Sequence, residues 1–320
     1  MTKPVLLQVG AYPDFDREPL EAAFEVVTMF DAIGAPFTGE ARAAVLAEHG
    51  PNIRAIGTRG DLMADAEMIN ACPNLEIIAV NGVGYDGVDI KLAKEKGIRV
   101  TNTPDVLTGD VADLAVAMWL MLQRKMTRAE AWARSGEWGQ KGAFELARQA
   151  YGRRAGVLGL GRIGAAIARR LAGFDMEIGY TARSDKGIDW TYHEDAVALA
   201  RASDVIFVAS VANEETRHIV NAEVLRALGP DGAVINISRA QNIDEEALLE
   251  ALESGAIAGA GLDVFEGEPN VNPRFAALDN VVMQPHIGSA TLETRKGMGR
   301  LMRDNLAAHF EGRPLLTPVV

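Results

Sequence analysis

The chain has little cysteine, few aromatic residues and no long hydrophobic run. Cys72 is the only cysteine in 320 residues, so the sequence offers neither an internal disulfide nor a cysteine zinc site. Its setting, Asn-Ala-Cys-Pro-Asn, favours a small buried residue, because a nucleophile would need a base and a helix N-terminus beside it. The longest apolar run, Leu114 to Leu122, is well short of the roughly 18 residues that a membrane span requires.

Basic residues are also fewer than acidic residues. Lys and Arg number 32 against 44 Asp and Glu, a net charge of −12, which disfavours general binding to nucleic acid. The N-terminal segment lacks the apolar run of a signal peptide. Hydrophobic residues at 48% and charged residues at 24% exclude a disordered chain. We therefore expect a cytoplasmic protein that binds neither nucleic acid nor a membrane, with about two domains for this length.

Short apolar runs alternate with helical patterns along most of the sequence. These runs are β-branched and apolar on both faces, which predicts parallel strands covered by helices on both sides. The predicted strands are Val5–Val9, Arg54–Gly57, Leu75–Val80, Ile98–Asn102, Ala155–Leu158, Glu177–Tyr180, Val205–Ala209, Ala233–Ile237, Gly259–Asp263 and Val281–Met283. The sequence thus predicts an α/β fold of two doubly wound parallel-sheet domains.

The division between these domains is predicted near residue 100. From Pro104 to Gly136 there is no strand signal, and an apolar helix over Gly109–Arg124 begins the connection. A last helix, Thr291–Phe310, follows the final strand and is expected to pack back on the first domain. This gives one domain of residues 1–100 completed by 288–320, and a second of residues 101–287.

The pattern G-x-G-x-x-G occurs twice, at 82–87 and at 159–164. The second copy follows a predicted strand and opens a helix, and Ile163, Ile167 and Leu171 form one apolar face of that helix. This context is typical of a dinucleotide-binding loop, with Gly159 and Gly161 allowing a tight turn and a close approach of the pyrophosphate. The first copy is either an anion-binding nest for a substrate carboxylate or a plain strand-to-helix turn.

The strand after the second loop bears on the choice of cofactor. An NAD ribose is normally bound by an acid at this strand end, but here Arg183 and Ser184 stand there, with Lys186 behind. A guanidinium and a hydroxyl suit a 2′-phosphate, so NADPH is favoured. Asp185 is the opposing charge, and Arg183 as a plain solvated residue is the alternative.

Three polar positions follow predicted strands in the second half of the chain, where ligands of open α/β sheets gather. They are Arg239, a glutamate in Glu266-Gly-Glu268, and His286. Of the five histidines, only His286 directly follows an apolar strand and precedes a Gly-Ser turn. Position alone does not choose between the two glutamates.

Together these motifs resemble the D-2-hydroxyacid dehydrogenase family, most closely its NADPH-dependent glyoxylate/hydroxypyruvate and hydroxyphenylpyruvate reductases. The resemblance runs from about Leu75 to Val320. It rests on the motifs Asn81-Gly-Val-Gly-Tyr-Asp86, Thr101-Asn-Thr-Pro-Asp-Val-Leu-Thr108, Gly159-Leu-Gly-Arg-Ile-Gly164, Asn236-Ile-Ser-Arg239, Gly261-Leu-Asp-Val-Phe265 and Pro285-His-Ile-Gly-Ser289.

The resemblance implies an enzyme that reduces a small 2-keto acid to the D-2-hydroxy acid. It places the catalytic arginine at Arg239, the histidine-pairing glutamate at Glu268 rather than Glu266, and the acid/base at His286. It implies a catalytic, substrate-binding first domain and a dinucleotide-binding second domain, with the active site in the cleft between them. Further cofactor contacts fall at Thr108, Leu160, Arg162, Ile163, Ile237, Ser238, Asp263 and Ser289, and no metal is implied.

The family likeness also suggests the remaining contacts. The backbone of Val83 and Gly84 is expected to bind the substrate carboxylate, and Arg59, Trp119 and Trp138 are candidates for the substrate pocket. A homodimer joined through the apolar helix is expected, with Trp138 near the partner's substrate site. A related formate dehydrogenase has Gln where Glu268 stands here, so the glutamate favours ketone reduction. A dinucleotide-sensing corepressor of the same fold is the alternative function.

Overall fold

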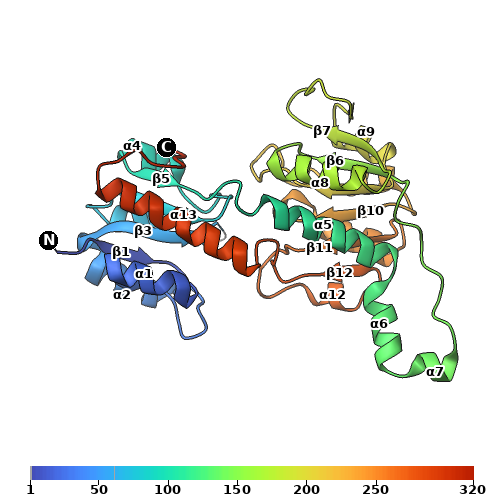
Figure 1. Cartoon of the computed structure of the whole chain (residues 1–320), viewed down its shortest axis with the longest axis horizontal. Coiled ribbons are helices and arrows are strands. Elements are labelled where there is room, and N and C mark those ends of the chain that lie inside the picture. The colour runs from blue at the N-terminus through green and yellow to red at the C-terminus, as the bar shows by residue number, and fades with distance from the viewer. Residues whose placement is uncertain (1, 61) are drawn as a thin grey trace. The chain divides into compact units, whose positions relative to one another are not determined.

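The computed structural model of this chain describes residues 2–60 and 62–320, which form two compact units. The first unit runs to Leu107 and is completed by Ala290–Val320, and the second unit is Thr108–Ser289 (Figure 1). The first unit ends later than the sequence placed it because residues 101–107 remain tied to it. The Thr103 N–H donates to Gly82 O at 2.8 Å, for example.

The first unit is a parallel sheet in the order β2-β1-β3-β4-β5, with helices on both faces. Its strands are β1 (Val5–Gln8), β2 (Glu25–Thr28), β3 (Ile53–Arg59), β4 (Ile77–Asn81) and β5 (Arg99–Thr101). Its helices are α1 (Asp14–Ala23), α2 (Gly39–His49), α3 (Ala66–Ala71), α4 (Ile90–Glu95) and α13 (Leu292–Phe310), with a short 3-10 turn at Gly50–Asn52.

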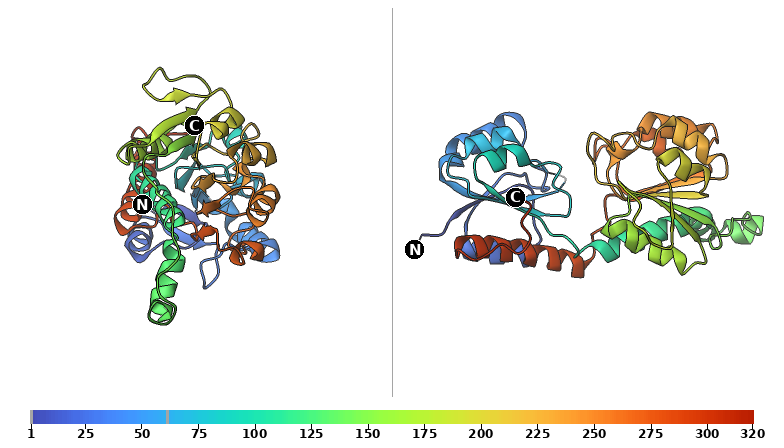
Figure 2. Two further views of the ribbon diagram at one scale, coloured as in Figure 1. Left: turned by 90° about the vertical axis from the view of Figure 1, so that its right-hand side faces the viewer. Right: turned by 90° about the horizontal axis from the view of Figure 1, so that it is seen from above.

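Neighbouring residues along these strands point to opposite layers. Leu6 and Ile77 pack with α1 and α13, whereas Leu7 and Ile78 pack with the helices on the other side. Figure 2 shows these two layers above and below the first sheet. A strand buried on both faces needs apolar residues at every position, which explains the continuous runs in the sequence.

The second unit is a parallel sheet in the order β12-β11-β10-β9-β6-β7-β8. Its strands are β6 (Arg154–Leu158), β7 (Glu177–Thr181), β8 (Thr191–Tyr192), β9 (Val205–Val208), β10 (Ala233–Asn236), β11 (Gly259–Leu262) and β12 (Val281–Met283). Its helices are α5 (Thr108–Gln123), α6 (Met126–Arg134), α7 (Glu137–Lys141), α8 (Arg162–Ala172), α9 (Ala196–Arg201), α10 (Ala222–Leu228), α11 (Glu245–Glu253) and α12 (Pro273–Ala276), with a 3-10 turn at Ala240–Asn242.

The strand order of the second unit reverses between β6 and β9, which is the dinucleotide-binding arrangement of doubly wound sheets. The predicted α/β class with two such parallel sheets is confirmed. Among the strands of the described residues, β2 and β8 were not predicted; they are short edge strands with partly exposed side chains. Half-exposed strands lack the continuous apolar signal that revealed the others.

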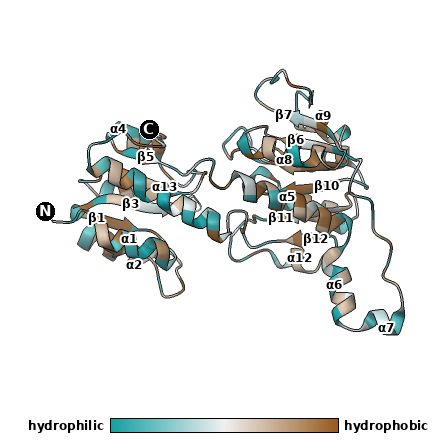
Figure 3. Ribbon diagram, viewed as in Figure 1, coloured by the Kyte–Doolittle hydropathy of each residue, from teal (hydrophilic) through white to brown (hydrophobic). Residues whose placement is uncertain are grey.

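The apolar helix α5 packs inside its own unit. Its buried residues include Val111, Met118 and Trp119, and it lies against α8 and the β11 side of the sheet (Figure 3). By contrast, α6 and α7 contain no buried residue and form an arm that extends away from the second sheet (Figure 1). Packing in the core of the second unit therefore explains the apolar character of α5. The residues of α6 and α7 lie instead at the surface of the arm.

Cys72 lies in the hydrophobic core of the first unit. Cys72 is 2% exposed, and burial raises the pKa of its thiol to about 11, so the thiol stays protonated. No helix in the described part of the chain is long and apolar enough to cross a membrane.

Candidate functional site

The candidate site lies at the carboxyl edge of the second sheet. Strands β6, β9, β10, β11 and β12 are parallel neighbours, so the loops that follow them lie along one edge. These loops carry Gly159, Ser210, Arg239, Asp263 and His286. Ligands of open α/β sheets bind at this edge, beside the point where the strand order reverses.

The three glycines of the loop after β6 have different surroundings. Gly159 has φ +98°, and a Cβ there would lie 2.6 Å from the backbone of Ser210. A Cβ on Gly164 would lie 2.2 Å from the carbonyl oxygen of Gly159, which holds α8 close to β6. A Cβ on Gly161, however, would meet nothing within 4 Å. Two glycines therefore allow close packing within the protein, and the third leaves open space for a ligand.

The N-terminus of α8 faces this open space. Gly161 is its N-cap and supplies no side-chain cap, so the first amides of the helix are left for another acceptor. The N–H groups of Gly159 and Leu160 both donate to Thr181 O at 3.2 Å. The amide of Leu160 is thus used to tie the loop to β7, while Arg162 and Ile163 open the helix. This arrangement fits a dinucleotide pyrophosphate, which helix N-termini bind through amides and the helix dipole.

The loop that follows β7 carries the predicted phosphate-binding residues. Arg183 and Ser184 are exposed, and no carboxylate of the described residues forms an ion pair with Arg183. Asp185 accepts a hydrogen bond from the Tyr180 hydroxyl at 2.6 Å and one from the Gly187 N–H at 2.9 Å. The tyrosine hydrogen bond lowers the pKa of Asp185. The exposed cation and hydroxyl fit a 2′-phosphate, whereas this acid is engaged within the protein.

A histidine and a glutamate lie together after β12 and β11. His286 Nδ1 is 2.8 Å from Glu268 Oε2, and Glu268 Oε1 accepts the Phe265 N–H at 2.8 Å. The Glu266 side chain makes no hydrogen bond or ion pair among the described residues, and its backbone N–H donates to Glu245 Oε2 at 3.2 Å. The structure thus brings Glu268, not Glu266, to the imidazole.

Asp263 fixes the loop that presents the histidine. This carboxylate is 2% exposed, and its two oxygens accept the N–H groups of Ile287 at 2.7 Å and Gly288 at 2.8 Å. Burial raises the pKa of Asp263 above its usual value, although these two hydrogen bonds oppose the shift. His286 itself has φ +55°, a conformation that non-glycine residues rarely adopt. A cofactor contact was predicted for Asp263, whereas these bonds to the histidine loop were not, since they join residues that are 24 and 25 positions apart.

Two asparagines hold the loop that carries Arg239. Asn236 accepts the Ser238 N–H at 3.0 Å, and its amide donates to Arg239 O at 3.0 Å. Asn242 is 0% exposed and donates to Ser210 O at 3.0 Å and to Ser238 Oγ at 3.0 Å. These bonds join the ends of β9 and β10. Neither asparagine was predicted as a site residue, and the role of Asn242 depends on a loop that is distant along the chain.

The remaining predicted cofactor residues also lie in the second unit. Thr108 opens α5, and Ser289 is the last residue of the unit. Ile237 follows β10 and is 7% exposed. In the described residues, no group of three or more His, Cys, Asp or Glu side chains could hold a metal ion.

The predicted substrate-binding residues lie in the first unit, at the carboxyl edge of its sheet. Arg59 ends β3 and pairs in register with Asn81, the last residue of β4. Val83 and Gly84 follow β4, and the Val83 carbonyl accepts the side-chain amide of Asn102 at 2.8 Å. The neighbouring β3 and β4 thus bring all three candidates to one edge of this sheet.

The two tryptophan candidates differ. Trp119 is 2% exposed and donates from its indole nitrogen to Ala150 O at 3.3 Å, so it belongs to the core and is not a pocket residue. Trp138 is 67% exposed on α7. Their sequence settings already differ, because Trp119 lies in the apolar run Leu114 to Leu122 and Trp138 lies among polar residues and glycines.

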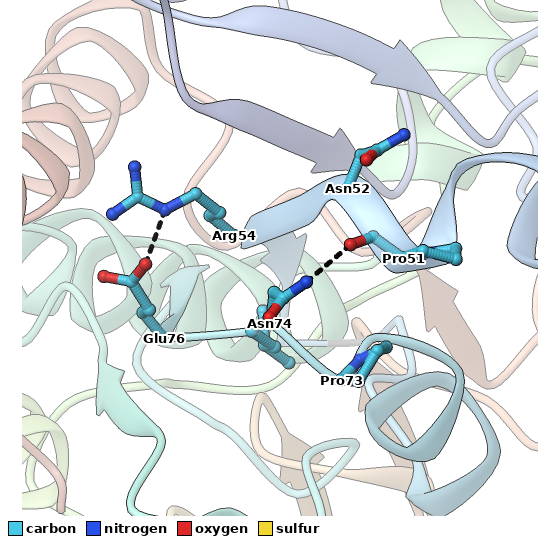
Figure 4. A pocket seen from close by; sticks show the side chains of 7 residues that line it. Pro51, Asn52, Arg54, Pro73, Asn74 and Glu76 are labelled. Atoms are coloured by element: carbon cyan, nitrogen blue, oxygen red, sulfur yellow. Dashed lines mark hydrogen bonds and ion pairs between the residues drawn. The ribbon is translucent and has the colours of Figure 1, made fainter.

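A surface pocket of about 580 Å³ lies elsewhere in the first unit. Figure 4 shows its lining, with Arg54 paired to Glu76 and the Asn74 amide donating to the Pro51 carbonyl. These residues lie at the amino-terminal starts of β3 and β4, the edge opposite to Val83 and Gly84. The pocket therefore contains none of the predicted site residues.

Comparison with known proteins agrees with this arrangement. Residues 116–288 match the family described as D-isomer specific 2-hydroxyacid dehydrogenase, NAD binding domain. The chain belongs to this family. It is 48% identical over 285 residues to a hydroxyphenylpyruvate reductase of Plectranthus scutellarioides, covering 89% of this chain and 91% of that protein.

Solved structures of the family resemble the whole chain. A 2-hydroxyacid dehydrogenase from Ketogulonicigenium vulgare is 60% identical with a TM-score of 0.91, covering 100% of this chain and 99% of that one. An NADPH-dependent glyoxylate/hydroxypyruvate reductase from Sinorhizobium meliloti, in complex with NADP and malonate, is 43% identical with a TM-score of 0.92. The match covers 100% of this chain and 97% of that one. The predicted family resemblance is thereby confirmed.

Proposed function

We propose that this dehydrogenase reduces a small 2-keto acid, such as glyoxylate or hydroxypyruvate, to the D-2-hydroxy acid with NADPH. One observation carries the proposal: a histidine paired at 2.8 Å with Glu268 lies on the same sheet edge as a dinucleotide-binding glycine loop. Histidine is the side chain that ordinarily exchanges a proton near neutral pH, and reduction of a ketone requires one proton for each hydride. The names of the relatives support the substrate class.

In this mechanism, NADPH supplies the hydride when bound. Arg239 and the amides of Val83 and Gly84 bind the carboxylate of the keto acid, and Arg239 also polarises the keto oxygen. Since Nδ1 of His286 faces Glu268, the other ring nitrogen donates the proton to the developing alkoxide. Glu268 stabilises the imidazolium before that donation.

NADPH is preferred over NADH because of the residues after β7. Arg183 is an exposed guanidinium without a carboxylate partner in the described chain, and Ser184 adds a hydroxyl beside it. Both can bind a 2′-phosphate. The structure of the Sinorhizobium meliloti relative with NADP supports this choice.

The exposed arm provides the surface for a homodimer. The arm and the segment that follows α7 expose Met126, Trp138 and Leu146, whose exposed fractions are 43%, 67% and 94%. Large apolar side chains gathered on one exposed segment are typical of protein interfaces. Light scattering at micromolar concentration should give a dimer, and a fully active monomer would exclude this assembly. We also propose a cytoplasmic enzyme, since the single cysteine requires no oxidising compartment.

The decisive experiment measures initial rates for a panel of 2-keto acids with NADPH and NADH. We expect turnover of glyoxylate or hydroxypyruvate, a preference for NADPH, and a D-configured product where the product is chiral. Arg183→Ala should weaken NADPH binding by about 1.5–3 kcal/mol, the value of a charged hydrogen bond, and should leave NADH nearly unaffected. Absence of turnover with every acid would refute the proposal, and equal use of both cofactors would refute the cofactor assignment.

A further inference from the structure

Asp185 is the acid that directly follows Arg183 and Ser184 in the loop that we assign to the 2′-phosphate, where a carboxylate would repel NADPH. Its position admits two roles with opposite consequences. It either faces the ribose and favours NADH, or it serves the loop itself. The hydrogen bonds around it distinguish the two roles.

Tyr180 anchors the loop from inside the sheet. It lies in β7, is 0% exposed, and its ring packs against Tyr192 of β8 with 5.6 Å between ring centroids. Its hydroxyl donates to Asp185 Oδ1 at 2.6 Å and accepts the Lys186 N–H at 2.8 Å. A buried hydroxyl with both bonds satisfied holds a loop firmly, because breaking either bond leaves a polar group unpaired.

Asp185 completes the turn from its own side. The oxygen that accepts the tyrosine hydroxyl also accepts the Gly187 N–H at 2.9 Å, two residues along the chain. This is the local bond by which aspartate stabilises turns. Gly187 has φ +61°, which lets the chain reverse here. The start of the connection between β7 and β8 is therefore closed behind Arg183 and Ser184.

We infer that Tyr180 and Asp185 are positioning residues for cofactor selectivity. Their hydrogen bond, here called the staple, holds Arg183 and Ser184 toward the 2′-phosphate. The inference rests on the proposed use of NADPH. Asp185 acts through the loop and does not bind the ribose. Removal of the acid therefore harms NADPH binding even though it removes a repulsive charge.

The test measures binding of two fragments by calorimetry, with no substrate present. Adenosine 2′,5′-bisphosphate carries the 2′-phosphate, whereas 5′-AMP lacks it. Tyr180→Phe and Asp185→Ala should each weaken the bisphosphate roughly 5- to 20-fold and change 5′-AMP less than about 2-fold. The matched control is Tyr192→Phe, because no hydrogen bond of the Tyr192 hydroxyl occurs among the described residues. It should leave both affinities unchanged.

Two further measurements separate positioning from general stability. In an Arg183→Ala background, Tyr180→Phe should cause no additional loss of bisphosphate affinity, because the positioned cation is already absent. Hydrogen exchange at the amides of Lys186 and Gly187 should accelerate in both staple variants. Asp185→Asn keeps an acceptor for the tyrosine and should retain most of the wild-type preference.

The outcomes are distinct. Tighter bisphosphate binding by Asp185→Ala would show that the acid opposes the phosphate, and the inference would be wrong. Equal losses for both fragments in Tyr180→Phe would also overturn it, since they would reveal a general structural defect. If the wild-type protein itself fails to prefer the bisphosphate, the proposed cofactor is wrong and the inference fails with it. A wild-type preference that survives both staple variants overturns the inference alone.

Discussion

The two glycines at the start of α8 should respond in opposite ways to the same added methyl group. At Gly164, the new Cβ would lie 2.2 Å from the Gly159 carbonyl oxygen and 3.1 Å from Val157 Cγ1. The first distance is about 1 Å inside van der Waals contact, and the obstacle is backbone that cannot rotate away. At Gly161, the same methyl would meet nothing within 4 Å.

The expected magnitudes follow from these contacts. Overpacking against backbone costs about 3 kcal/mol, and the better helix propensity of alanine returns about 1 kcal/mol. Gly164→Ala should therefore lower the free energy of unfolding by about 2 kcal/mol, or roughly 4–8 °C in Tm for a domain of this size. Gly161→Ala should cost less, about 0.5–1 kcal/mol, because alanine is a poorer N-cap than glycine. Its methyl occupies the space left for the pyrophosphate, so NADPH affinity should fall about 10- to 100-fold.

Thermal and urea unfolding measure the first effect, and fluorescence titration with NADPH measures the second. Each variant is the control for the other, because one loses stability and the other loses affinity. Wild-type stability in Gly164→Ala would show that the α8–β6 contact is not close. Wild-type NADPH affinity in Gly161→Ala would show that the cofactor does not approach this loop.

Three other substitutions test the remaining features. Glu268→Gln removes the charge that favours a protonated imidazole, so the pH at which the reduction rate falls should move lower. An unshifted pH–rate profile would remove Glu268 from the mechanism, and a shift seen with Glu266→Gln instead would show that Glu266 is the carboxylate that acts on the histidine. His286→Ala should lower kcat by roughly 10²–10⁴ with NADPH affinity nearly intact by titration, and a small loss of kcat would remove His286 as the acid. Gly299→Ala would place a Cβ 2.0 Å from the buried Asp16 carboxylate and should destabilise by about 1–3 kcal/mol; an unchanged urea midpoint would contradict this packing.

Local patterns in the sequence determined the fold class and most of its elements. Strands buried on both faces must be apolar throughout, so runs such as 205–208 and 233–236 were visible without tertiary information. The glycine loop was equally visible, because its turn and helix start depend on neighbouring residues. The edge strand β8 was not visible in the sequence, since Thr191 and Tyr192 become a strand only by pairing with β7.

The tertiary structure decided which of several similar residues reach the site. Trp119 and Trp138 were both candidates for the substrate pocket, yet packing buries the first and leaves the second exposed. Glu268 was separated from Glu266 by family resemblance, and in the structure it is Glu268 whose carboxylate lies at the histidine. The engagement of Asp185 likewise depends on Tyr180, whose hydroxyl reaches it only after β7 forms and the loop turns back. Local propensity and burial pattern are encoded in short segments, whereas side-chain pairing across loops exists only when distant segments have been brought together.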